Sequence, residues 1–312
     1  MINSILRKIN RDKLNVLTHF CHERADSNIA QTGHNFYSIP GEHVRTWDEK
    51  KTPIPQNYHF VPGSVLQYID FDVVLCGNPV HLAGLEGIAR QFNLPLICIF
   101  HTNPPGGWAP EMFEEQFGRF TNVFITETNS LLWSGKVGNV IHHYIDCDTF
   151  RPGVKEDYFL SVVNDWLNRS YEYGWEVYQR IIQGVPAKIV GDTPGLSQPA
   201  SSLAEIAQEF ATAKFFVNTS LSSPISMSLL EAAAGGCTII TTGCDAIPDF
   251  FKHRESAMIF SPQYPEEGAE MIKEVLGNKE LADKLGKNAR KVAEQYTLDR
   301  FVNSWNDVLE NI

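Results

Sequence analysis

The chain has 312 residues, enough for two domains, and it has the composition of a folded globular protein, with 43% hydrophobic and 20% charged residues. Its formal net charge is −11. This charge argues against a protein that grips nucleic acid by neutralising many phosphates, because that mode needs clustered Lys and Arg. The densest basic stretch (Arg7, Lys8, Arg11 and Lys13) is interpreted as a solvated end of the chain.

Signals for secretion, membrane insertion and disulfide formation are missing from the pattern. No apolar run of signal-peptide length precedes the first predicted strand, and no stretch approaches the ~20 apolar residues of a membrane-spanning helix. The six cysteines are scattered and form no C-x-x-C pair, which is typical of reduced thiols rather than of a zinc site. We therefore expect a cytoplasmic protein.

Short apolar runs alternate with segments of helical period along the whole chain. In the first half the pattern predicts strands at 14–20, 71–76, 94–100 and 123–126, and a helix at 82–92. In the second half it predicts strands at 159–163, 187–190, 215–218 and 237–241, with helices at 174–182, 203–210 and 227–234. This alternation is typical of parallel sheets covered on both faces, so the expected fold class is α/β with two Rossmann-like βαβ domains.

Two further segments have a predicted place in these domains. Pro and Gly interrupt the pattern at Phe150-Arg151-Pro152-Gly153, where we expect the boundary between the domains. Residues 280–312 are helical in period and could simply cap the second domain. The two domains should face each other across a cleft at the carboxyl ends of both sheets, where ligands of this architecture bind.

The stretch from Asn218 to Pro248 is the most informative. It predicts a strand, a polar loop from Thr219 to Ser226, a helix, a Gly-Gly turn and a second strand. The free N–H groups and the positive dipole end of that helix form a site for a diphosphate. Glu231 lies inside the helix in apolar company, and ribose hydroxyls would give its carboxylate hydrogen-bond donors.

This stretch resembles the nucleotide-sugar signature of the retaining family 4 glycosyltransferases (glycosyl transferases group 1). Glu231 falls on the second Glu of that signature, Gly235-Gly236-Cys237 on its small turn, and Ala246-Ile247-Pro248-Asp249 on its I-P-E segment. The family's first Glu contacts the donor sugar, and Ser223 stands in its place here. Both the sugar specificity and full activity are therefore open at this point.

Two more motifs carry the resemblance. The run from His142 to Pro152 resembles the family's interdomain segment, and Val190 to Gly195 resembles its V-G-D-G-P turn. The resemblance implies a GT-B fold with an N-terminal domain at 1–150 on the acceptor side and a nucleotide-sugar-binding domain at 151–295. The final helix, about 296–312, is implied to return to the first domain.

The resemblance also implies roles for individual residues. Arg169 would pair with the diphosphate, with Asn164 as a further donor, and the alternative is a surface cation beside Glu172. His101, at the end of a buried strand, would contact the donor sugar and is the second catalytic candidate, although a structural His is an equal alternative. The donor-binding set comprises Asn164, Arg169, Gly191, Asp192, Ser223, Ile225, Ser226, Met227, Ser228, Leu229 and Glu231.

The acceptor side is less defined. After the first strand we expect a polar loop at 22–35 on the edge of the cleft, with Arg24, Asn28, Gly33 and His34 as acceptor-binding candidates, or else a packing loop that touches no substrate. Glu127 and Asn129 are weaker candidates, for which a loop role is favoured. The pattern contains no metal-binding motif, so we expect neither a metal ion nor a cofactor.

The expected function is transfer of a hexose or pentose from a nucleotide diphosphate sugar, with UDP favoured, to an acceptor hydroxyl with retention of configuration. The acceptor could be a glycan, a lipid-linked sugar, a protein or a modified base in DNA, the last being disfavoured by the acidic charge. A catalytically weak nucleotide-sugar-binding or scaffold protein is the alternative in another class, suggested by Ser223 and Asn164 at two usual functional positions.

Overall fold

The computed structural model describes residues 13–41 and 44–312. Within it the chain forms two compact units. Unit 1 consists of two segments, the described residues up to His142 and Asp299–Ile312, and unit 2 is the continuous segment His143–Leu298. Both divisions fall near the domain boundaries expected from the sequence at 150 and 296. Arg7, Lys8 and Arg11 of the basic stretch lie outside the described residues.

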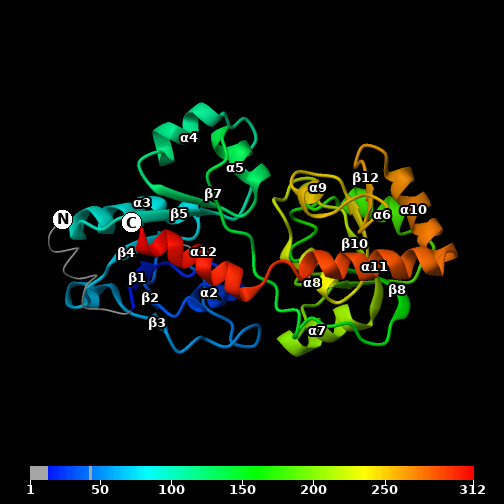
Figure 1. The fold of residues 1–312 in the computed structure, drawn as a ribbon, viewed down its shortest axis with the longest axis horizontal. Coiled ribbons are helices and arrows are strands. Elements are labelled where there is room, and N and C mark those ends of the chain that lie inside the picture. Colours follow the sequence, from blue (N-terminus) through cyan, green and yellow to red (C-terminus); the bar gives the residue numbers. More distant parts are fainter. Residues whose placement is uncertain (1–12, 42–43) are drawn as a thin grey trace. The chain divides into compact units, whose positions relative to one another are not determined.

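Unit 1 is built on a seven-stranded parallel sheet with the order β3-β2-β1-β4-β5-β6-β7 (Figure 1). Its central strands are almost wholly apolar and buried on both faces, as expected for a parallel sheet between helices. The strands are β1 (Asn15–Thr18), β2 (Asn35–Ser38), β3 (Tyr58–Phe60), β4 (Val73–Cys76), β5 (Leu96–Phe100), β6 (Thr121–Phe124) and β7 (Asn139–Val140).

Helices complete unit 1 around an aromatic core in which Phe100 packs against Phe113, Phe117, Phe124 and Trp133. The helices are α2 (Glu23–Ala30), α3 (Leu82–Phe92), α4 (Pro110–Phe117), α5 (Glu127–Ser134) and α12 (Leu298–Glu310), with the short turns η1 (Gly63–Tyr68) and η2 (Pro79–His81).

Unit 2 is built on a five-stranded parallel sheet with the order β12-β11-β10-β8-β9. Helix α8 packs against α7 and α11, whereas α6 packs against α10 (Figure 1). The strands are β8 (Glu156–Val162), β9 (Ala187–Val190), β10 (Ala213–Asn218), β11 (Thr238–Thr242) and β12 (Met258–Phe260). The helices are α6 (Trp175–Ile181), α7 (Leu203–Thr212), α8 (Met227–Ala234), α9 (Ile247–Phe250), α10 (Pro265–Gly277) and α11 (Lys279–Ala293).

Three expectations about local structure need correction. The polar loop expected at 22–35 is mostly the helix α2, which begins after His22, whose ring Nδ1 accepts a hydrogen bond from the backbone N–H of Arg24. The helical pattern at 280–312 is divided into α11 and α12 by a break at 294–297. The strand expected at 123–126 ends at Phe124, because Thr126 instead caps α5 by accepting from the backbone N–H of Asn129 at 2.9 Å.

Candidate functional site

The loops that follow β8, β9, β10 and β11 emerge at one edge of the sheet of unit 2, since all five strands are parallel. Ligands of open α/β sheets bind at such carboxyl ends. All residues of the predicted donor set lie on these loops or on the helix α8 that follows β10. The structure thus brings the predicted donor-binding residues to a single edge of one unit.

The loops after β8 and β9 are locked together. The carboxamide oxygen of Asn164 accepts a hydrogen bond from the backbone N–H of Asp192 at 2.8 Å, and the N–H of Asp165 donates to the carbonyl of Asp192 at 2.7 Å. Gly191 has φ +143°, and a Cβ there would lie 2.0 Å from the carbonyl oxygen of Val163. Only glycine allows this close approach, so Gly191 shapes the loop through its backbone.

Arg169 lies in a turn after β8, as the sequence predicts for a phosphate-binding cation. Its guanidinium forms an ion pair with Glu172 at 2.6 Å and lies over the ring of Tyr173, 4.2 Å from the ring centre. The side chain is 45% exposed, and exposed pairs of this kind contribute at most about 1 kcal/mol. The structure therefore contains the Glu172 contact of the alternative interpretation, in a pair weak enough to exchange for a phosphate.

The Arg169 turn is also joined to the loop that precedes α8. The hydroxyl of Thr219 donates to the carbonyl of Tyr173 at 3.0 Å, and the N–H of Leu221 donates to the carbonyl of Glu172 at 2.8 Å. These bonds place the turn that carries Arg169 beside the polar loop Thr219 to Ser226.

Helix α8 begins at Met227 and ends at Ala234, as predicted. Ser226 is its N-cap residue, but its hydroxyl lies 2.6 Å from the hydroxyl of Ser228 and does not cap a backbone N–H. The first N–H groups of a helix have no partner within the helix, so this end suits an anionic ligand. Glu231, one turn further on, is 2% exposed.

Asp245 is a residue of this edge that the sequence analysis did not single out. It follows β11, and its Oδ2 accepts a hydrogen bond from the backbone N–H of Ser223 at 2.7 Å. Its backbone has φ +45°, in the left-handed region. The only signal in the sequence was an isolated Asp shortly after a predicted strand.

The donor-sugar candidate of unit 1, His101, directly follows β5 and so lies at the carboxyl edge of its own sheet. Burial, together with a smaller contribution from charge repulsion by His22, lowers the pKa of His101 to about 4. The imidazole is therefore neutral at physiological pH and could donate and accept hydrogen bonds without carrying charge. Its contact with a donor sugar stays a prediction.

Two weaker candidates follow β6. The carboxamide of Asn129 is buried and donates to the carbonyl of Thr102 at 2.9 Å, so this residue holds the loop after β5 in place. Glu127 lies 3.6 Å from Nε2 of His142. Both residues lie in the first turn of α5 rather than in the expected loop, and the contact of Asn129 is with the backbone of the loop after β5.

The four acceptor candidates do not lie together. Arg24 and Asn28 belong to α2, whereas Gly33 and His34 follow that helix, next to the start of β2. His34 is 5% exposed, and its Nδ1 accepts from the N–H of Leu14, just before β1. Gly33 and His34 therefore lie at the amino edge of the sheet, and the expectation that they line its carboxyl edge is wrong.

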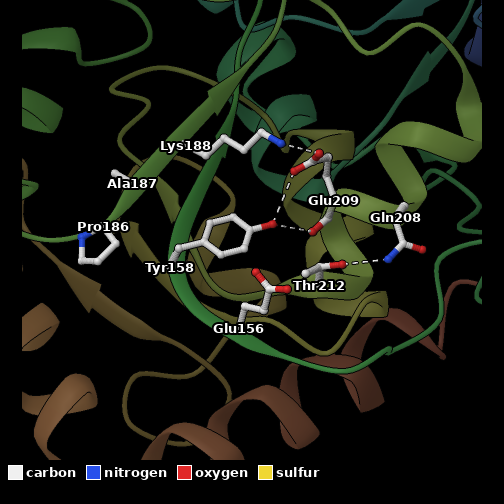
Figure 2. Close-up of a pocket in the computed structure, with 8 residues that line it drawn as sticks. All are labelled: Glu156, Tyr158, Pro186, Ala187, Lys188, Gln208, Glu209 and Thr212. Carbon is white, nitrogen blue, oxygen red and sulfur yellow. Dashed lines mark hydrogen bonds and ion pairs between the residues drawn. The ribbon is translucent and has the colours of Figure 1, made fainter.

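A pocket of about 490 Å³ lies at the opposite edge of unit 2, at the amino ends of β8 and β9 and against α7 (Figure 2). Its polar groups bind one another: Lys188 pairs with Glu209 at 2.5 Å, the hydroxyl of Tyr158 points at Glu209, and Gln208 donates to Thr212 at 2.8 Å (Figure 2). The pocket includes none of the predicted donor residues.

Among residues 13–41 and 44–312, no helix is long and apolar enough to cross a membrane. In the same part of the chain, no group of three or more His, Cys, Asp and Glu side chains could hold a metal ion. Independence from metal stays a prediction for experiment.

Two parallel sheets with flanking helices give this chain the GT-B fold that the sequence predicts. Residues 198–292 match the family Glycosyl transferases group 1, a stretch that contains β10, α8 and β11 with the predicted donor motif. The resemblance to glycosyl transferases group 1 noted in the sequence is therefore confirmed.

One relative is similar to part of this sequence, and several solved structures are similar to it in fold. The chain is 25% identical over 124 residues to sulfoquinovosyl transferase SQD2 of Arabidopsis thaliana, a match that covers 39% of this chain and 23% of that enzyme. Anabaena HepE, solved in complex with UDP and glucose, has a similar fold, with a TM-score of 0.76 and 13% identity over 96% of this chain and 100% of that one. Sucrose-phosphate synthase of Thermosynechococcus elongatus has a TM-score of 0.73 and 11% identity, covering 96% and 99%.

Proposed function

We propose that the protein is a metal-independent glycosyltransferase that moves a sugar from a UDP-sugar to an acceptor hydroxyl with retention of configuration. The observation that carries the proposal is the match of residues 198–292 to group 1 glycosyltransferases, which includes the uncapped end of α8 and the buried Glu231. The complexes of HepE with UDP and with UDP-glucose support a uridine nucleotide as donor.

The geometry of unit 2 suits the departure of a nucleoside diphosphate. The diphosphate would lie at the N-terminus of α8, where backbone N–H groups stabilise the negative charge that grows as the bond to the sugar breaks. Arg169 would leave Glu172 to add a bidentate contact, and the Nδ2 group of Asn164 would donate a further hydrogen bond. Glu231 would accept from the ribose hydroxyls.

The reaction itself needs positioning more than protein nucleophiles. An acceptor hydroxyl attacks the anomeric carbon on the face from which the diphosphate departs, as retention requires, while the bond from that carbon to the diphosphate oxygen breaks and the hydroxyl proton passes to the leaving diphosphate. Positioning the donor for this attack and stabilising the leaving group are the two effects that we assign to the carboxyl edge of unit 2. Retention is proposed from the family resemblance.

Calorimetric titration with UDP, GDP and their sugars tests the donor, because a specific site binds the uridine series more tightly. Turnover of the best donor in excess EDTA then tests independence from metal, and proton NMR of the product's anomeric signal tests retention. A wild-type protein that binds no nucleotide sugar contradicts the proposal.

A catalytically weak sugar-nucleotide-binding protein is the second candidate. It is favoured by Ser223 in the place of the expected Glu and by the pairing of Arg169 with Glu172. This candidate predicts tight binding of UDP-sugars without transfer or hydrolysis.

A further inference from the structure

The loop after β11 holds a backbone conformation that its sequence does not favour. Asp245 has φ +45°, in the left-handed region that residues other than glycine adopt rarely, Asn and Asp being the most frequent of them. Glycine would adopt this conformation at lower cost, and what Asp245 adds to it is a carboxylate. Strained residues of this kind cluster at ligand-binding sites.

The Asp245 carboxylate lies beside the loop that feeds α8. Strands β10 and β11 are neighbours, and Asn218 at the end of β10 donates to the hydroxyl of Thr241 at 2.9 Å. The loops that follow these strands therefore run side by side. The 2.7 Å bond from the N–H of Ser223 to Oδ2 of Asp245 then fixes the carboxylate at position 223.

Position 223 is where the sequence lacks a carboxylate. Ser223 replaces the Glu that the resemblance leads one to expect, and its short side chain carries no charge. Asp245 brings a carboxylate to the same point of the edge from the next loop. A carboxylate is an acceptor with about four lone-pair sites, and the hydroxyls of a sugar are donors.

We propose that Asp245 binds hydroxyl groups of the donor sugar and thereby takes the place of the carboxylate that is missing at Ser223. The inference rests on the proposed function, since it assigns the sugar part of the same donor site. One Oδ atom holds the Ser223 loop, and the carboxylate as a whole selects sugars that present a hydroxyl at this point.

A comparison of the affinities for UDP and for UDP-sugars separates the contribution of the nucleotide to binding from that of the sugar. UDP-glucose, UDP-galactose and UDP-N-acetylglucosamine are titrated into the full chain, and the tightest is compared with UDP. Asp245→Asn tolerates the left-handed backbone and keeps the size of the side chain. It should weaken the UDP-sugar by about tenfold or more, because a hydrogen bond to a charged group is lost, and leave UDP unchanged.

Asp245→Gly supplies a second readout. It accepts the left-handed backbone but removes the carboxylate altogether, so the UDP-sugar should bind as weakly as UDP. Adding Ser223→Glu to this variant should restore part of the preference for the UDP-sugar. Arg254→Gly is the matched control, because Arg254 also has a positive φ, +61°, on another loop, and this variant should leave both affinities unchanged.

The outcomes distinguish the two proposals. A wild type that binds no nucleotide refutes the proposed function and this inference with it. A wild type that prefers the UDP-sugar, with variants that keep the same preference, refutes the role of Asp245 alone. Equal loss of UDP and UDP-sugar in Asp245→Asn would also refute it, because the carboxylate would then only support the loop.

Discussion

The side chain of Lys155 caps the C-terminal ends of two helices, α7 and α8. Its ammonium donates to the carbonyls of Phe210 and Ala213, both at 2.9 Å at the end of α7, and to that of Gly235 at 2.6 Å at the end of α8. Burial lowers the pKa of Lys155. The last carbonyls of a helix have no partner within the helix, and a cation there also meets the negative end of the dipole.

The variant Lys155→Met keeps an unbranched side chain one atom shorter and removes the ammonium that makes the three hydrogen bonds. Each hydrogen bond to a charged group contributes about 1.5–3 kcal/mol, but the three share one ammonium and are not additive. The partial exposure lets water replace some of them. We therefore expect a loss of about 3 kcal/mol, a large fraction of the roughly 5–15 kcal/mol that stabilises a typical domain.

Hydrogen exchange followed by mass spectrometry localises this effect. The peptides that end α7 and α8 should exchange faster in Lys155→Met, while α3 in unit 1 serves as an internal reference. Lys188→Met is the matched control, because Lys188 is 51% exposed and its pair with Glu209 should contribute no more than about 1 kcal/mol. If both variants lose the same small amount of stability in urea, Lys155 does not hold the two helices.

Four further predictions concern single residues of the two units. Arg169→Ala should lower turnover about tenfold or more and lower donor affinity by less, and Arg169→Lys should restore part of the rate. If steady-state kinetics show the wild-type rate for both variants, Arg169 does not belong to the site. Glu231→Ala should weaken UDP binding with little change in fold, and unchanged calorimetric affinity in a folded variant would remove Glu231 from the site. Gly191→Ala should lower thermal stability strongly, because its Cβ would lie 2.0 Å from the carbonyl oxygen of Val163. Gly184 also has a positive φ but open space around it, so Gly184→Ala should lower the free energy of unfolding by only about 1 kcal/mol. Equal losses of stability in the two variants would contradict this reasoning. Burial raises the pKa of Asp26 from 3.8 to about 6, so the contribution of its protonated form to stability is full below pH 3.8 and is lost as the pH rises through 6. Over this range the free energy of unfolding of Asp26→Asn, relative to that of the wild type, should rise by up to about 3 kcal/mol. A difference that does not change with pH would contradict the burial argument.

Two elements begin and end at the predicted residues, for different reasons. Helix α8 is an almost wholly buried apolar segment between a polar loop and a Gly-Gly turn. Strand β9 has only Val190 buried among its four residues, but Pro186 and Gly191 mark its two ends. Helix α2 was missed because its buried positions include the carboxylates of Glu23 and Asp26. Asp26 is buried with hydrogen bonds from Tyr58 and from the N–H groups of Cys21 and His22, which no periodicity reveals.

The candidate site shows the same limit. A motif places Glu231 and Ser223 on one loop and helix, since their spacing is local. The contact of Ser223 with Asp245 joins residues of separate loops through the pairing of β10 with β11, and a sequence read along one chain does not contain that pairing. Gly33 and His34 were assigned to the wrong edge of the sheet because helix α2, which was not predicted, carries the chain from the carboxyl edge to the amino edge.

The discontinuous chain of unit 1 has a consequence for synthesis on the ribosome. Phe301, Trp305 and Leu309 of α12 are buried in the structure, yet they are translated after the whole of unit 2. We therefore expect unit 1 to complete its fold only after α12 has been synthesised, with the apolar surface that α12 covers exposed until then. Unit 2 is continuous in sequence and can fold as soon as it emerges from the ribosome. The second half of the chain should become protease-resistant first, and the first half only once its last helix has been released from the exit tunnel.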